Sequence, residues 1–308
     1  MRREILVVAI ALIAASCSGS DGDNRTRTPH PSSTRTPPSA AKPGTYAVGE
    51  LTETFVDTSR KTESANGQGN APARTLVTVI HYPQSDGPFP LIVLAHGRTG
   101  HPNKFSQLTT AWASAGFVVA APVFPLTSNQ TTFETDADYI NQPADVSFVI
   151  DRVLARSQDH DGPLARRVDK RHIGVSGLSL GGATVYGIAF NSCCRDHRID
   201  AALVMAGILL PYDGAFEFPS VPLLIIHGNS DPLGRDPYGM ARPPKYLMTL
   251  DRPTHSPPFE DTPDPADELV VTVTVDFWNA YLHEQRGAVN ALSTDAMAPG
   301  VATLEQQR

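Results

Sequence analysis

The sequence predicts an α/β domain in which about eight mostly parallel strands alternate with helices that cover both faces of one sheet. Short apolar runs alternate with segments of helical periodicity from residue 45 onward. Two of the runs, PLIVLAHG (90–97) and PLLIIHG (222–228), are almost entirely apolar, as is typical of parallel strands that are buried on both faces. Between them, residues 171–190 pass from a β-branched run through the glycine-flanked Ser179 into a helix of small residues.

Each element is predicted from its local pattern. A glycine-rich segment, 64–73, separates two early strands, Gly116 ends the first helix, and Pro143 suits the first turn of the second. The last segment is assigned as a helix although it is rich in β-branched residues. We expect strands at residues 49–58, 74–83, 90–97, 117–124, 171–177, 201–207, 222–228 and 245–250. We expect helices at residues 102–116, 143–157, 181–190 and 268–285.

Composition and charge narrow the class of protein. The chain has 308 residues, of which 41% are hydrophobic, so it can bury the core of one large domain. The formal net charge is -7 and the basic residues are scattered, which argues against a nucleic-acid-binding protein.

Cys193 and Cys194 have only His197 near them, so we expect no metal site there. They form either a disulfide between neighbours or two buried thiols, with a structural role in both cases. We expect no cofactor.

The N-terminal residues are expected to lie outside the fold. Residues 1–16 combine a basic start, an apolar run too short to span a bilayer, and small residues before Cys17, which is the pattern of a signal peptide. The stretch Ala14-Ala15-Ser16-Cys17 resembles a bacterial lipobox, which implies cleavage before Cys17, acylation of its sulfur, and a lipid anchor in the bacterial cell membrane outside the cytoplasm. The alternative is a plain secretory signal and a secreted protein. Residues 17–44 are predicted to be an extended tether and residues 45–308 the folded domain.

The spacing around Ser179 fits the G-x-S-x-G turn that presents a serine nucleophile at the end of a buried strand. Serine needs a base, and the base needs an acid that orients it; in this architecture the acid and then the histidine follow in loops after later strands. Asp231 follows the run 222–228, and His255 follows the run 245–250. We therefore predict that Ser179, Asp231 and His255 are the catalytic residues. Their competitors, which fit these loops less well, are Asp213, Asp236, His227 and His283.

An acyl-transfer site also needs backbone donors for the oxyanion of the tetrahedral intermediate. One is expected to be the N–H of Leu180, directly after the nucleophile. The other is expected to be the N–H of Arg98, in the segment HGRTG (96–100) after a predicted strand. The side chain of Arg98 either lines the pocket, where it would meet an anionic or polar group, or points to solvent, and the sequence leaves both open.

With these segments in place, the chain resembles an α/β-hydrolase over residues 45–286. The similarity rests on HGRTG, GLSLGG, GNSDPL and the loop of His255, and it is to the branch of dienelactone hydrolases, platelet-activating-factor acetylhydrolase-like lipases and cutinase-like polyester hydrolases. Dienelactone hydrolases use a cysteine where this chain has Ser179. The resemblance implies a serine carboxylic-ester hydrolase that forms an acyl-enzyme with a small-molecule or polymeric ester.

Three alternatives remain open at this point: an acyltransferase with the same three residues, a lipase or phospholipid acetylhydrolase-like enzyme, and a binding protein on the same fold. The stretch 208–221 lies where such enzymes carry a cap, and it is too short for a helical one. We therefore expect no large cap and a preference for short-chain or accessible esters.

Overall fold

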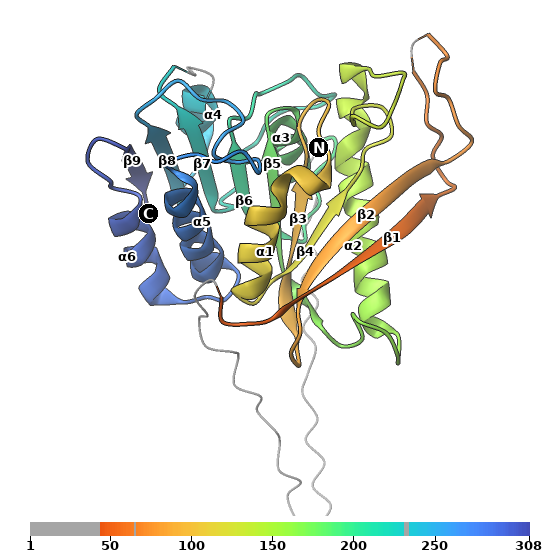
Figure 1. The fold of residues 1–308 in the computed structure, drawn as a ribbon. Coiled ribbons are helices and arrows are strands. Elements are labelled where there is room, and N and C mark those ends of the chain that lie inside the picture. Colours follow the sequence, from red (N-terminus) through yellow and green to blue (C-terminus); the bar gives the residue numbers. More distant parts are fainter. Residues whose placement is uncertain (1–43, 65, 231–233) are drawn as a thin grey trace, which may run out of the picture. The chain divides into compact units, whose positions relative to one another are not determined.

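The computed structural model describes residues 44–64, 66–230 and 234–308 (Figure 1). The predicted signal peptide, nearly all of the predicted tether, Cys17 and Asp231 lie outside the described residues. Within the described ranges, no helix is both long enough and apolar enough to cross a bilayer.

The described residues form nine strands in one sheet, in the order β1-β2-β4-β3-β5-β6-β7-β8-β9. The neighbouring strands β4, β3, β5, β6, β7 and β8 are parallel. The outer strands β1, β2 and β9 pair antiparallel with their neighbours. Their bounds are β1 Val48–Asp57, β2 Arg74–Pro83, β3 Phe89–Ala95, β4 Val118–Pro122, β5 Val168–Leu178, β6 Ile199–Met205, β7 Leu223–Gly228, β8 Lys245–Leu250 and β9 Ala302–Gln307. The predicted fold class is confirmed, and all eight predicted strands are present.

Helices cover both faces of the sheet (Figure 1). The α-helices of the described residues are α1 Ser106–Ser114, α2 Gln142–Gln158, α3 Leu180–Phe190, α4 Arg235–Met240, α5 Asp267–Tyr281 and α6 Arg286–Asp295. Two short 3-10 helices, η1 Pro102–Phe105 and η2 Asp136–Asn141, lead into α1 and α2. The protein has two hydrophobic core clusters, one on each face of the sheet. Apolar residues of α2 and α3 belong to the first cluster, and those of α1, α5 and α6 belong to the second.

The central strands are apolar because both of their faces are covered. Every residue of β3, β4 and β7 is buried. Helix α3 is also buried at every position, which agrees with its small and apolar residues. On the opposite face, Trp112 of α1 and Trp278 of α5 meet edge to face with centroids 5.7 Å apart, and the Trp112 indole N–H donates to Thr274 Oγ1 at 2.9 Å. Helix α1 is therefore a firmly packed element, which bears on the site below.

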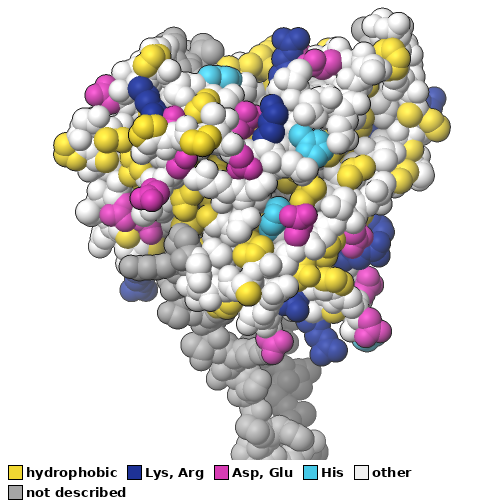
Figure 2. Space-filling view, viewed as in Figure 1, with side chains coloured by type: hydrophobic (Ala, Val, Ile, Leu, Met, Phe, Trp, Pro, Cys, Tyr) yellow, Lys and Arg dark blue, Asp and Glu magenta, His cyan; other side chains and the backbone are white. Residues whose placement is uncertain are grey.

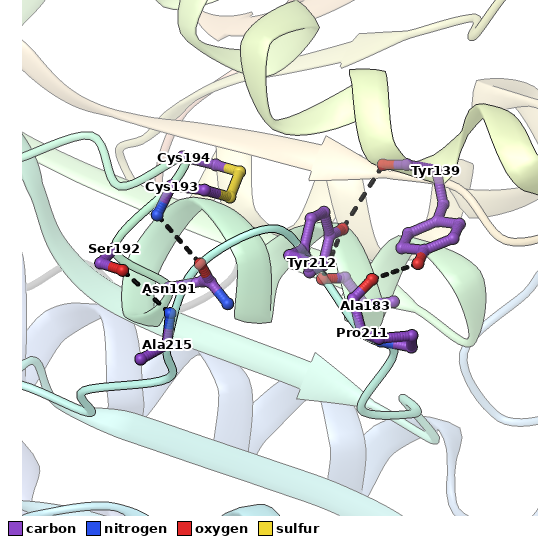
Figure 3. Close-up of a disulfide and its surroundings, with 9 residues drawn as sticks. All are labelled: Tyr139, Ala183, Asn191, Ser192, Cys193, Cys194, Pro211, Tyr212 and Ala215. Atoms are coloured by element: carbon purple, nitrogen blue, oxygen red, sulfur yellow. Dashed lines mark hydrogen bonds between the residues drawn. A yellow bond between two sulfur atoms is a disulfide. The ribbon is translucent and has the colours of Figure 1, made fainter.

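The connection between β6 and β7 lies on the nucleophile helix. Residues 206–222, all of them described, contain no helix, so the prediction that there is no large cap is confirmed. The Tyr212 hydroxyl donates to the carbonyl oxygen of Ala183 in α3 at 3.1 Å, and the Tyr139 hydroxyl donates to the carbonyl oxygen of Pro211 (Figure 3). These bonds tie the connection to the domain beneath it.

Cys193 and Cys194 form a disulfide in the loop that follows α3 (Figure 3). The same loop is held by side-chain bonds: the Cys193 N–H donates to Asn191 Oδ1 at 3.0 Å, and the Ala215 N–H donates to Ser192 Oγ at 3.0 Å. Of the two arrangements that the sequence left open, the structure has the disulfide, and it lies at the far end of α3 from Ser179.

Candidate active site

Ser179 occupies the sharp turn between β5 and α3. Its backbone has φ 56° and ψ -113°, a conformation that side chains with a Cβ rarely adopt, and the Ser179 N–H donates to the carbonyl oxygen of Met205 at 2.9 Å. The turn leaves Ser179 half-buried, although it follows a strand end that is fully buried. This is the geometry that the glycine spacing predicts.

The positions on either side of the Ser179 turn require glycine, because a Cβ there would collide with backbone atoms. A Cβ on Gly177 would collide with the carbonyl of Gly181, and a Cβ on Gly181 would collide with the carbonyl of Ala95 at the end of β3. A Cβ on Gly182 would lie 2.6 Å from the α-carbon of Gly207. The obstacles are backbone atoms of central elements, which cannot move aside.

His255 lies in the loop after β8 and reaches Ser179 across the top of the sheet. Its Nε2 is 2.9 Å from Ser179 Oγ, so the serine hydroxyl donates to Nε2 when the neutral imidazole carries its proton on Nδ1. This is the distance that a general base needs for the proton it removes. The two residues are separated by 76 positions in the sequence, and β6 and β7 lie between their strands, so the loop after β8 brings His255 to Ser179.

The segment that leads to Asp231 runs beside the segment that leads to His255. The Asn229 N–H donates to the carbonyl oxygens of Leu250 and Arg252 at 2.9 and 3.1 Å. A Cβ on Gly228 would lie 2.6 Å from backbone atoms of Thr254, so the two chains are in close contact. The competitor His227 is buried within β7 and its Nε2 is 3.1 Å from Thr249 Oγ1, which agrees with a packing role.

The loop after β3 carries the predicted oxyanion donor, and a buried histidine holds it. His96 Nε2 accepts from the Phe124 N–H at 3.1 Å, and His96 Nδ1 lies 2.7 Å from the carbonyl oxygen of Gly97. A backbone N–H can only donate, so Nε2 carries no proton and Nδ1–H donates to Gly97. Burial lowers the pKa of His96 to about 4, which keeps this tautomer neutral.

His96 thereby fixes the orientation of one peptide group. The carbonyl of Gly97 accepts from His96 and also from the Gly100 N–H at 3.0 Å. In a trans peptide the N–H points away from the C=O, so these bonds aim the Arg98 N–H away from His96. A Cβ on Gly97 would lie 3.3 Å from Ser179 Cβ, which places this peptide beside the nucleophile. A role for His96 was not predicted from the sequence. The only feature of the sequence that could have indicated it is its position directly before Gly97.

The N–H of Leu180 is the first of α3 and has no partner within the helix, as holds for every first-turn N–H. It lies directly after Ser179, whereas the Gly97–Arg98 peptide comes from the loop after β3. The positive end of the helix dipole adds to its capacity to stabilise negative charge. Both predicted oxyanion donors thus come from segments that border Ser179.

The Arg98 side chain turns to the neighbouring loop. Its Nε is 2.9 Å from Glu134 Oε1 and 3.1 Å from Asp136 Oδ1, and 63% of the side chain is exposed. The two carboxylates satisfy the guanidinium at the surface, so of the two orientations left open the one toward solvent is found. Asp138, further along the same segment, pairs with the fully buried Arg74 at 2.9 Å, which fixes the segment to β2.

Two aromatic side chains in the segment after β4 differ in their surroundings. Phe124 is fully buried and packs on His96 with ring centroids 5.0 Å apart, so it belongs to the core. Phe133 is 43% exposed and lies close to Gly69 in the connection between β1 and β2, so its ring is available at the surface. Among the described residues, no group of three or more His, Cys, Asp or Glu is placed to hold a metal ion.

The sheet order, the turn at Ser179 and the histidine that reaches it define a protein of the α/β-hydrolase class. A model of the Chlorophyllase family, an α/β-hydrolase-like family, matches residues 42–215, which is more than half of the chain. The chain belongs to this family, and membership indicates a hydrolase that acts on esters. The matched range includes Arg98, Ser179 and Leu180 and ends before Asp231 and His255. No curated protein matches the chain.

Proposed function

We propose that the protein is a serine carboxylic-ester hydrolase that works through an acyl-enzyme. The observation that carries the proposal is the 2.9 Å approach of His255 Nε2 to Ser179 Oγ on a glycine-bounded turn. Family membership gives the ester-hydrolase class, and this contact supports the finer assignment of nucleophile and base.

In the first half-reaction, Ser179 Oγ attacks the ester carbonyl carbon while His255 Nε2 takes the hydroxyl proton. The oxyanion is stabilised by the N–H groups of Leu180 and Arg98. When the tetrahedral intermediate collapses, His255 returns the proton to the leaving alcohol oxygen. Asp231 holds the imidazole in the tautomer with a proton on Nδ1 and stabilises the imidazolium.

In the second half-reaction, His255 removes a proton from water, whose oxygen attacks the acyl carbon. The second tetrahedral intermediate then releases the carboxylic acid, and His255 protonates Ser179 Oγ. The open connection over α3 favours substrates that reach Ser179 without a lid movement, namely short-chain or polymeric esters. An alcohol in place of water would give acyl transfer, and product analysis with an added alcohol distinguishes the two.

The test replaces the two residues that touch. Ser179→Ala and His255→Ala should each lower kcat for a short-chain aryl ester by on the order of 10⁴-fold or more, and Asp231→Asn somewhat less. His197→Ala, an exposed histidine beside the disulfide loop, is the matched control and should keep its kcat. Near-normal hydrolysis by Ser179→Ala would overturn the assignment.

For the location of the enzyme, we propose that Cys17 is the lipidated N-terminus of the mature protein. The support is the order of basic start, apolar run and small residues before Cys17. A lipoprotein with several acyl chains is firmly anchored, so the wild type should pellet with membranes and Cys17→Ala should be released. Equal partitioning of the two proteins would instead indicate a plain signal peptide.

A further inference from the structure

The loop that carries His255 has little secondary structure of its own. Residues 251–266 connect β8 to α5 without a helix or strand, and five of these described residues are prolines. His255 itself is exposed. A segment of this length needs contacts with the rest of the domain if it is to hold a base within 2.9 Å of Ser179 Oγ.

One carboxylate supplies such a contact. Asp261 Oδ2 accepts from the Ser106 N–H at 2.9 Å, and Asp261 Oδ1 accepts from the Gln107 N–H at 2.8 Å. These N–H groups are the first two of α1, whose N-cap residue Phe105 makes no side-chain cap bond. Asp261 therefore caps a helix that lies 154 to 155 positions away in the sequence, and its charge suits the positive end of that helix.

The contact extends to the residues on either side. The Asp261 N–H donates to the carbonyl oxygen of Lys104 at 2.6 Å, and Lys104 Nζ lies 3.7 Å from Glu260 Oε1. Phe259 is buried in the cluster that contains α1 and α5. The loop is thus fastened to α1 at a point six residues beyond His255, and α1 is itself held by the Trp112–Trp278 contact.

The same helix follows directly on the oxyanion loop. The chain runs from Gly97 and Arg98 through His101 into η1 and then α1, so the segment with the Arg98 N–H ends where Asp261 binds. We infer that Asp261 is a positioning residue: it fixes the histidine loop relative to the oxyanion loop, and so sets the base and the oxyanion donor at the right separation. This inference rests on the proposed function.

The experiment compares Asp261→Ala and Asp261→Asn with the wild type. The asparagine would keep one acceptor oxygen and place an NH₂ group against the other backbone donor, so Asp261→Asn should lose one of the two cap bonds and Asp261→Ala both. Because a misplacement of about 1 Å can lower catalysis by about a hundredfold, we expect kcat to fall between about ten- and a hundredfold while KM stays within about twofold. Completed fluorophosphonate labelling of Ser179 counts the folded sites, and kcat is expressed per labelled site.

Hydrogen exchange supplies a readout that does not depend on catalysis. Peptides covering 251–262 and 102–108 should exchange faster in both variants. The control is Asp200→Asn, because Asp200 Oδ2 also accepts from a backbone N–H, that of Ile173 at 2.8 Å, in the middle of β5 and away from the loop of His255. It should lower the melting temperature without lowering kcat per site.

Unchanged exchange, or an unchanged kcat per labelled site, would overturn the inference about Asp261. A failure of the proposed function would be visible elsewhere, as hydrolysis that persists in Ser179→Ala.

Discussion

At the scale of single residues, His96 shows how one protonation state can direct a backbone donor. Its Nδ1–H holds the carbonyl of Gly97 and its Nε2 holds the Phe124 N–H, so both ring nitrogens are used and neither contact is to substrate. The consequence for catalysis follows from the Gly97 contact alone, because that peptide carries the Arg98 N–H. The two contacts can be separated by substitution.

Asparagine and glutamine should affect activity differently at this position. In His96→Asn the short side-chain amide falls near the place of Nδ1 and can donate to Gly97, whereas the longer amide of His96→Gln reaches toward the Phe124 N–H. We expect His96→Gln to lower kcat by about a hundredfold and His96→Asn by less than about tenfold. Steady-state kinetics with one short-chain ester, alongside melting temperatures, test this. Equal losses would mean that the Gly97 contact does not govern the oxyanion donor.

His96 also makes stability depend on pH. Its pKa is about 4 in the folded protein and near 6.5 when unfolded, so between these values the unfolded chain binds more protons. The stabilisation is complete above pH 6.5 and is lost as the pH falls toward 4, by on the order of 3 kcal/mol. Denaturant titrations of the wild type and His96→Asn from pH 7 to pH 4 should give a steeper fall for the wild type. Parallel curves would contradict this.

At the scale of elements, the turn between β5 and α3 depends on space that only glycine leaves. Gly181→Ala should lower the free energy of unfolding by about 3 kcal/mol or more and remove most activity, because the new methyl group meets the Ala95 carbonyl. Gly287→Ala in α6 is the control: a Cβ there meets no atom within 4 Å, and alanine should stabilise by up to about 1 kcal/mol. Denaturant unfolding measures both. A soluble, active Gly181→Ala enzyme would show that β3 and α3 can separate.

The elements that the sequence predicted are those with a strong apolar pattern. The eight predicted strands have buried faces, whereas β9 buries only Ala302 fully and is held by its pairing with β8, so its hydrophobic signal is weak. Helices α4 and α6 were not predicted; α6 has only two buried residues. The closing helix was expected to reach residue 285 but ends at Tyr281, because the chain turns at Glu284 with φ 54°.

Within the site, the positions of Ser179, Leu180 and Arg98 in the fold could be predicted because their motifs are local, and their roles in catalysis stay predictions. His255 could be predicted because its loop follows a recognisable strand. Asp231 lies outside the described residues and stays a prediction. The tautomer of His96 is set by a contact with Phe124 across 28 positions, and Asp261 binds Ser106 across 155 positions, so no local pattern predicts either arrangement.

At the scale of the whole molecule, the absence of a cap predicts how the rate depends on substrate concentration. Basic and acidic side chains are interspersed on the face viewed in Figure 2, and residues 206–222 form no helix that would open at a lipid surface. The rate on a short-chain triglyceride should therefore rise smoothly through the solubility limit. Short-chain esters should also react faster than long-chain triglycerides. A sharp rise above the solubility limit would contradict the open site.

The disulfide has a practical consequence for production of the protein. It joins residues that are adjacent in the chain, so its ring encloses no intervening residue, and the stabilisation from cross-linking grows with the number of residues enclosed. Reduction would open this ring without freeing any long segment of the domain. Bacterial expression in a reducing cytoplasm, with residues 1–43 omitted, should therefore yield the same α/β domain as expression in an oxidising compartment, and thiol reductants can be kept in purification buffers.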